Sequence, residues 1–217
     1  MIRLFVFDLD GTLVDSLRDL ADSANELVVQ CGGTPLGLDA IGRMVGEGAA
    51  TLVVRFFSAA GLERPPDALD RFLAIYDTKL LNHTRAYAGM PETIAALASR
   101  ASLAVLTNKP LDATRRILEG LQLSSFFEAD AVVGGDGPLR RKPDPSGLLH
   151  LCARVNVSPA DAMLVGDSLI DWETARQAGT EICLARYGFG FREFPQDKLD
   201  GREQLIDSPA ELLTLAV

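Results

Sequence analysis

The sequence is poor in cysteine and histidine, and this scarcity argues against several kinds of chemistry. Its three cysteines, Cys31, Cys152 and Cys183, lie far apart inside apolar segments, so we expect free buried thiols rather than disulfides or a nucleophile. The two histidines, His83 and His150, lie far from any nucleophile motif. A Ser-His-Asp hydrolase is therefore not indicated.

Long apolar runs and an excess of positive charge are also lacking. No apolar stretch approaches the roughly 20 residues that a membrane-spanning helix needs. No leader precedes the apolar run that begins at Ile2, so we expect a cytoplasmic protein. The 21 basic residues are outnumbered by 30 acidic ones, giving a net charge of −9, which argues against nucleic acid or a membrane surface as a partner. An acidic protein that handles an anionic substrate needs a local cation.

The clearest pattern is at the N-terminus. An apolar run at residues 4–7 stops at Asp8-Leu9-Asp10-Gly11-Thr12. Such a run, bounded by a polar turn, predicts a short strand that is buried on both faces of a parallel sheet. The aspartates then lie at its carboxyl end, where open α/β sheets bind their ligands.

The spacing of Asp8 and Asp10 favours a bound cation. Residues i and i+2 leave an extended chain on the same side. Two carboxylates a few ångströms apart repel by about 4 kcal/mol at an effective dielectric constant near 20, so a cation or a shared proton has to offset the repulsion. With oxygen ligands and no histidine or cysteine nearby, Mg²⁺ suits the pair better than zinc.

The rest of the chain predicts an α/β fold in two parts. Between Asp15 and about Arg85 the apolar residues form helical stripes only, at residues 17–28, 52–60 and 69–80. From Pro91 onward, helical patterns alternate with short apolar strands at residues 103–106, 131–133, 162–165 and 182–185. We therefore predict a Rossmann-like three-layer α/β/α core with a parallel sheet, formed by residues 1–14 and 88–217. A small all-helical cap, residues 15–87, is inserted after the first strand, and residues 87–91 form a return linker that can act as a hinge.

Further polar residues occur at or near the ends of the predicted strands, and the ends of parallel strands share one edge of a sheet. They are Thr107, Asn108, Asp167 and Asp171. Asp167 and Asp171 are four residues apart, which places both on one face of a helix start, where they can point at a metal. Lys142 lies in Arg140-Arg141-Lys142-Pro143-Asp144-Pro145, just before a predicted helix. Taken alone, Thr107 would be a helix cap and Lys142 a solvated charge.

Taken together, these motifs resemble those of the haloacid dehalogenase superfamily, and within it the phosphoglycolate phosphatase-like branch. The resemblance rests on residues 8–16, on Thr107 after its strand, on Lys142 in a Lys-Pro-x-Pro pattern, and on residues 166–171. The motifs occur in the family's order, so the resemblance covers essentially the whole chain. Residues 186–190 are also similar to a Gly-aromatic segment of that branch.

The resemblance implies a Mg²⁺-dependent phosphomonoester hydrolase that acts through an aspartyl-phosphate on a small phosphorylated metabolite. The first candidate substrate is 2-phosphoglycolate. Asp8 is then the nucleophile, Asp10 the acid and base, and Lys142 the cation that neutralises the phosphoryl group. Mg²⁺ is held by Asp8, the backbone carbonyl of Asp10, and Asp167. Asp171 either binds the metal through water or orients another ligand.

The resemblance also implies contacts to the substrate. Thr107 and Asn108 hold phosphoryl oxygens. In the cap, Gly46-Glu47-Gly48 is either a nest of amides facing the substrate or a helix start with unusual dihedral angles. The family favours substrate contact at Gly46, with Arg43 as a neighbouring cation.

Other functions stay open at this stage. A hexose-phosphate mutase of the β-phosphoglucomutase type keeps the same aspartates but returns the phosphoryl group to the sugar, and other small-metabolite phosphatases share the site. A phospho-accepting regulatory domain also combines acidic residues, a Thr or Ser, and a lysine, but lacks a helical insertion. An inert, partner-binding relative is a further alternative, although every catalytic position is filled. The sequence does not distinguish a monomer from a homodimer.

Overall fold

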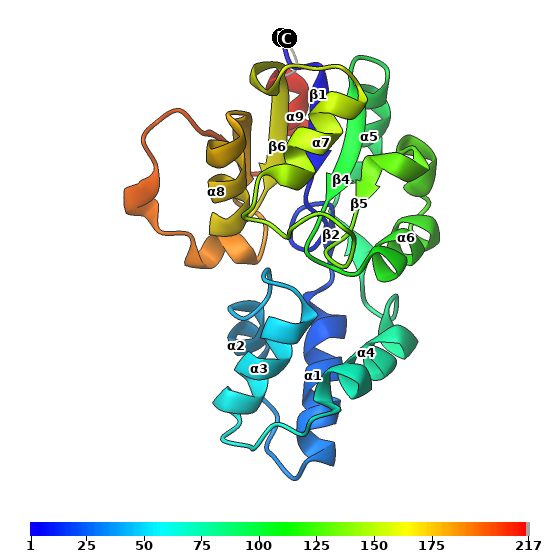
Figure 1. Cartoon of the computed structure of the whole chain (residues 1–217), viewed down its shortest axis with the longest axis vertical. Coiled ribbons are helices and arrows are strands. Elements are labelled where there is room, and N and C mark those ends of the chain that lie inside the picture. The colour runs from blue at the N-terminus through cyan, green and yellow to red at the C-terminus, as the bar shows by residue number, and fades with distance from the viewer. Residues whose placement is uncertain (216–217) are drawn as a thin grey trace.

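The computed structural model describes residues 1–215 and shows an α/β core with a helical block attached at one end (Figure 1). Within the described residues, the core sheet has six parallel strands in the order β5-β4-β1-β6-β7-β8. These strands are β1 (Leu4–Phe7), β4 (Ser102–Leu106), β5 (Val132–Val133), β6 (Ala162–Gly166), β7 (Glu181–Ala185) and β8 (Gln204–Ile206). The predicted parallel sheet is confirmed.

Helices cover both faces of this sheet because successive side chains of each strand point to opposite faces. Phe5 and Phe7 pack on one face, against α5 (Met90–Ala98), α6 (Leu111–Gly120) and α9 (Leu212–Leu215). Leu4 and Val6 pack on the other face, against α7 (Ser146–Arg154) and α8 (Leu169–Ala178). The three-layer α/β/α core is therefore confirmed.

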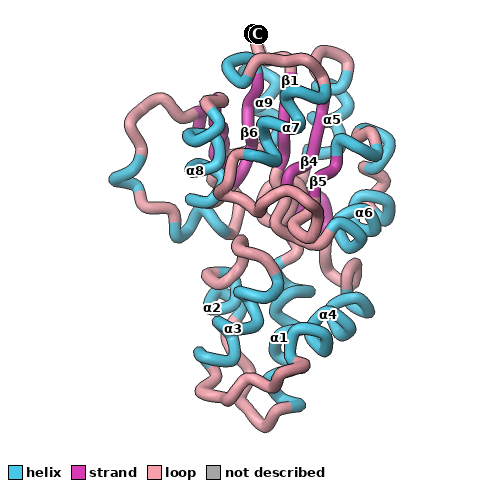
Figure 2. Tube along the Cα trace, in the orientation of Figure 1, coloured by secondary structure: helices cyan, strands magenta, loops and turns pink. Residues whose placement is uncertain are grey.

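The helical block contains α1 (Leu17–Gln30), α2 (Leu38–Gly42), α3 (Ala49–Ala59) and α4 (Ala68–Lys79). Figure 2 shows these helices below the sheet, joined to one another by loops. Phe56, Phe57 and Phe72 are fully buried between them, and the ring of Phe72 stacks on Tyr76 with centroids 6.0 Å apart. The block thus has apolar packing of its own, as the helical stripes predict.

A short antiparallel ribbon joins the block to the core. β2 (Val14–Asp15) pairs with β3 (Arg85–Ala86), with Val14 opposite Ala86 and Asp15 opposite Arg85. The chain therefore leaves and re-enters the core at adjacent points. The predicted domain boundaries, with residues 1–14 and 88–217 in the core and residues 15–87 in the cap, stay a proposal. The ribbon lies at these boundaries.

Five helices and strands were not predicted from the sequence, and each is short. β2 and β3 have two residues apiece, α9 has four, α2 has five, and β8 has three residues of which only Ile206 is buried. The cysteines are free, as predicted, but Cys31 is only partly buried because it follows the end of α1. No helix among residues 1–215 is long and apolar enough to cross a membrane.

Candidate active site

Three central strands of the sheet end in residues that the sequence singles out. β1 lies between β4 and β6, and Asp8, Thr107 and Asp167 directly follow these strands. The Asp8 N–H donates a hydrogen bond to the Val165 carbonyl at 2.8 Å, which fixes the end of β1 against β6. Distant parts of the chain thereby meet at one edge of the sheet, and this edge faces the helical block (Figure 1).

An acidic cluster lies at this edge. One carboxylate oxygen each from Asp8, Asp167 and Asp171 lies within 4.8 Å of the others. All three residues are buried, and Asp171 is completely inaccessible to solvent. The Gly190 N–H donates to Asp167 Oδ2 at 2.8 Å and helps to orient that carboxylate. Three buried carboxylates form the all-oxygen donor set that suits Mg²⁺.

Gly11 lets the turn after β1 approach this cluster closely. Its φ is +88°, in the left-handed region, and a Cβ at this position would overlap the Asp167 carboxylate. Only glycine fits both conditions. Glycine is therefore required at position 11 both by the close contact with Asp167 and by the backbone conformation of the turn.

Burial makes the cluster hold protons more tightly. It raises the pKa of the Asp8 carboxyl to about 7, although Lys142 beside it favours the charged form. Burial also raises the pKa of Asp167 well above its ordinary value, and the charges of Asp171 and Asp8 raise it further. A bound cation would oppose both effects.

Lys142 bridges two of these carboxylates. Its Nζ lies 2.8 Å from Asp8 Oδ1 and 2.6 Å from Asp171 Oδ1, and its side chain is only 3% exposed. Burial disfavours the ammonium charge, but Asp171 and Asp8 outweigh burial and raise the pKa of Lys142 above its usual range. Asp171 Oδ2 accepts hydrogen bonds from the Ser168 hydroxyl at 2.6 Å and the Ser168 N–H at 3.1 Å. Asp171 is thus held at the start of α8 and positions Lys142 beside Asp8.

Asp10 is held by two donors that the sequence analysis did not single out. Ser16 Oγ donates to Asp10 Oδ1 at 2.5 Å, and Lys109 Nζ lies 3.0 Å from both carboxylate oxygens. The Lys109 side chain is only 4% exposed. The one available signal was its place two residues after Thr107 at the end of β4, and that place does not reveal burial.

Thr107 and Asn108 have different surroundings. Thr107 Oγ1 accepts a hydrogen bond from the Lys109 N–H at 3.2 Å, so its own O–H can be donated to a ligand. Asn108 Nδ2 donates to the carbonyls of Gly46 and Lys142, each at 2.9 Å. The Asn108 side chain therefore links the helical block to the segment that carries Lys142.

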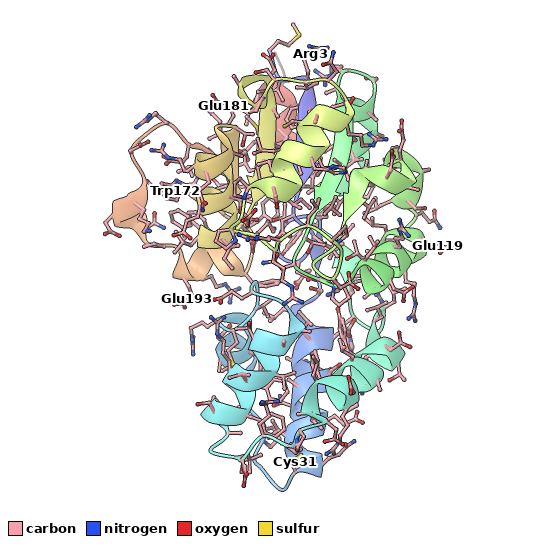
Figure 3. All side chains as sticks on the ribbon, in the orientation of Figure 1. Arg3, Cys31, Glu119, Trp172, Glu181 and Glu193 are labelled. Carbon is pink, nitrogen blue, oxygen red and sulfur yellow. The ribbon has the colours of Figure 1, made fainter. Side chains whose placement is uncertain are left out.

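The two predicted cap residues lie in different places. Gly46 lines the cavity above the acidic cluster. Arg43 lies in a separate cavity, where its side chain is 53% exposed and lies 3.9 Å from Glu193. Figure 3 shows Glu193 at the level where the core meets the helical block.

The cavity between core and block has a volume of about 230 Å³. Its floor contains Asp8, Asp10, Thr107 and Asp167. Its other wall is mainly hydrocarbon and includes Leu20, Val45, Leu52, Phe72, Leu73 and Leu80. A cavity of this size and lining accepts a small molecule with an anionic end and little polar surface elsewhere.

Comparison with known proteins decides the family. The family model of the haloacid dehalogenase-like hydrolases matches residues 5–185. The chain belongs to this family. The predicted superfamily and enzyme class are thereby confirmed, and the sheet with its helical insertion is the fold of these hydrolases.

Similar proteins of this family are phosphatases. A phosphoglycolate phosphatase from Rhodospirillum rubrum is 42% identical over 87% of this chain and 81% of its own length. A phosphoglycolate phosphatase from Nitrosospira multiformis is 38% identical over 87% of this chain and 85% of its own length. The crystal structure of a predicted phosphoglycolate phosphatase from Haemophilus somnus has a TM-score of 0.90 and 30% identity, and the match covers 100% of this chain and 98% of that one.

Proposed function

We propose that this hydrolase is a Mg²⁺-dependent phosphomonoesterase whose substrate is 2-phosphoglycolate. The buried cluster of Asp8, Asp167 and Asp171, together with the contact between Lys142 and Asp8, is the observation that supports this reaction. The names of the similar phosphatases support the substrate, as does the small cavity.

The residues present fit a magnesium ion. We infer that Asp8 and Asp167 hold it with the backbone carbonyl of Asp10, and that Asp171 acts through water or orients another ligand. The raised pKa values of Asp8 and Asp167 fit this role, because buried carboxylates that lack a cation prefer to be protonated. When bound, Mg²⁺ supplies positive charge that offsets the repulsion between the phosphoryl oxygens and the attacking carboxylate.

In the first half-reaction, a carboxylate oxygen of Asp8 attacks phosphorus in line with the ester oxygen. The P–O ester bond breaks, and Asp10 gives its proton to the departing alkoxide. In the second half-reaction, Asp10 takes a proton from water, and the resulting hydroxide attacks the aspartyl-phosphate. The bond between phosphorus and Asp8 breaks, which restores the carboxylate and releases inorganic phosphate.

Other residues hold the phosphoryl group in place. The Lys142 ammonium lies beside Asp8 Oδ1, where it stabilises negative charge on both the nucleophile and the transferred group. The Thr107 hydroxyl can donate to a phosphoryl oxygen. Asn108 contributes mainly by holding the Gly46 and Lys142 segments together through its side chain.

The cavity wall favours a short leaving group over a sugar. A hexose would bury several hydroxyl groups against leucine and phenylalanine side chains. Each buried hydroxyl without a partner costs about 1–3 kcal/mol. This argues for hydrolysis of a small ester rather than a hexose-phosphate mutase, and the helical block argues against a regulatory receiver-type domain.

The test is release of inorganic phosphate from 2-phosphoglycolate, hexose phosphates, nucleotides and pyrophosphate, with and without Mg²⁺. We expect rapid Mg²⁺-dependent release from 2-phosphoglycolate. Rapid release from another compound alone would contradict 2-phosphoglycolate as the substrate but would still support the phosphatase mechanism. Conversion of a hexose phosphate to its isomer without free phosphate would favour the mutase.

A further inference from the structure

The cavity has one positively charged side chain on its wall among the described residues that line it. We propose that this residue, Lys109, selects substrates whose leaving group carries a carboxylate. The proposal rests on the proposed function, since it concerns the ester that this site hydrolyses. It adds the residue that recognises the organic part of the substrate.

Charge in the cavity makes such a residue necessary. The aspartates on its wall are Asp8, Asp10, Asp77, Asp112 and Asp167. A second anionic group on the substrate would be repelled unless a cation compensates it. Lys142 is already in contact with Asp8 and Asp171, beside the position of the phosphoryl group. Lys109, which pairs with Asp10, is the cation on the described wall of the cavity that can face the other end of the substrate.

The position of Lys109 suits a short leaving group. Its Nζ lies 3.0 Å from both oxygens of Asp10. An ester oxygen that receives a proton from Asp10 must come within hydrogen-bonding distance of that carboxyl group. A carboxylate one carbon beyond the ester oxygen therefore falls beside the Lys109 ammonium.

The helical block supplies a second contact at the same place. Lys109 Nζ lies over the face of the Tyr76 ring, 4.6 Å from its centroid, so the ring stabilises the ammonium from the cap side. Tyr76 is only 4% exposed, and its hydroxyl has no hydrogen-bond partner among residues 1–215. Burial raises the pKa of Tyr76 to about 12, which keeps it a neutral donor. An unpaired buried hydroxyl beside an ammonium is the donor pair that a carboxylate satisfies.

The experiment compares two esters that differ only in this group: 2-phosphoglycolate, and ethyl phosphate, in which a methyl replaces the carboxylate. We expect the kcat/KM ratio of the two to be at least about 100 for the wild-type enzyme. Lys109→Gln keeps a donor for Asp10 but removes the charge. It should lower the ratio at least about tenfold, mainly through a higher KM for 2-phosphoglycolate.

Two further variants separate recognition from structure. Tyr76→Phe keeps the ring face, removes the hydroxyl, and should lower the same ratio several-fold; it carries the test if Lys109→Gln fails to fold. Lys79→Met removes a cap lysine that pairs with Glu26 at 3.0 Å and should leave the ratio unchanged. Thermal melting of each variant checks that it is folded.

The outcomes distinguish this proposal from the proposed function. If Lys109→Gln and Tyr76→Phe slow both esters equally, Lys109 only positions Asp10 and the inference is wrong. If the wild-type enzyme does not hydrolyse 2-phosphoglycolate, the proposed function fails, and the ratio is measured with 3-phosphoglycerate and glycerol 1-phosphate instead. A wild-type enzyme that prefers neither carboxylate ester would overturn the inference.

Discussion

At Asp8, burial and a neighbouring ammonium act in opposite directions on one carboxyl group. Burial favours the protonated form, Lys142 at 2.8 Å favours the charged form, and burial prevails. Asp8, the proposed nucleophile, therefore binds a proton more tightly than a free carboxyl group does, and a bound cation would favour its charged form. This property leads to two predictions at the scale of single residues.

Asp8→Asn should abolish hydrolysis and leave the fold intact. The amide has nearly the same shape but cannot form the phosphoryl-enzyme, so phosphate release should fall by at least about 10³-fold. Circular dichroism and thermal melting should match the wild-type protein. Asp197→Asn, at an exposed aspartate that does not line the cavity, is the control and should retain activity. Near-wild-type turnover by Asp8→Asn would contradict the assignment of the nucleophile.

Stabilisation by Mg²⁺ should increase with pH between about 6 and 8. Folding raises the pKa of Asp8 from 3.8 to about 7, so the folded chain without metal binds this proton more tightly than the unfolded chain. This carboxyl group's contribution to stability therefore falls as pH rises from about 4 to 7. Mg²⁺ needs the unprotonated carboxylates of Asp8 and Asp167, so it competes with protons at low pH.

Differential scanning fluorimetry at pH 6 and pH 8 measures this effect as the shift in Tm on adding Mg²⁺. The shift should be larger at pH 8, and Asp197→Asn, outside the cavity, should show the same pH dependence as the wild type. Equal shifts at both pH values would argue against protonated carboxylates in the metal site.

At the scale of elements, Asp19 ties α1 to the segment that returns to the core. The side chain is completely buried and accepts hydrogen bonds from the His83 N–H, the Thr84 N–H and the Thr84 hydroxyl, at 2.8 to 2.9 Å. Thr84 directly precedes β3. One carboxylate thus fixes the direction in which the chain leaves the cap.

Asp19→Asn should destabilise the protein by about 1–3 kcal/mol, because the amide offers fewer acceptor sites to these donors. Urea unfolding measures the loss. Asp22→Asn is the control on the same helix: Asp22 is partly exposed and pairs with Arg18 at 2.9 Å, so its replacement should cost less than about 1 kcal/mol. Equal losses for the two variants would show that the buried contacts of Asp19 do not matter.

The long elements could be predicted from the sequence because their own residues determine them. Residues 4–7 are apolar on both faces, and a strand between two helical layers requires this. β8 could not be predicted because Gln204, Leu205 and Ile206 carry no such pattern, and pairing with β7 creates the strand.

The candidate site likewise has residues whose positions could be predicted from the sequence and residues whose positions could not. Asp8, Asp10 and Asp167 follow recognisable strands, so their meeting at one edge follows from sheet topology. Lys109 touches Asp10 because the chain folds back from 99 residues away, and Ser16, six residues after Asp10, reaches it only through the turn that follows β1. The place of Arg43 outside the main cavity depends on how the cap sits on the core, and no local pattern determines that arrangement.

At the scale of the whole molecule, exposed contacts join the cap to the core in addition to the buried contacts of Asn108 and Lys109. Arg192 Nη1 of the core lies 2.9 Å from Asp39 Oδ1 of the cap, and Arg43 lies near Glu193. At the base of the ribbon, the rings of Tyr87 and Tyr187 lie 4.7 Å apart. Exposed ion pairs of this kind contribute little individually.

Arg192→Gln should therefore have a small effect. We expect the free energy of unfolding to fall by less than about 1 kcal/mol. KM should rise modestly with kcat nearly unchanged, because the closed cap loses one contact. Steady-state kinetics at low and high salt measure this, and high salt should reproduce the effect in the wild-type enzyme. A collapse of kcat would instead indicate that Arg192 contributes directly to the chemistry.

The β2–β3 ribbon has a consequence for how such an enzyme can diverge. Since Val14 and Asp15 pair with Ala86 and Arg85, the inserted block begins and ends at neighbouring points of the chain path. A different insert with equally close ends could occupy the same junction without rerouting any strand of the sheet. A block of another shape would change the upper wall of the cavity and leave the strand ends that carry Asp8, Thr107 and Asp167 in place.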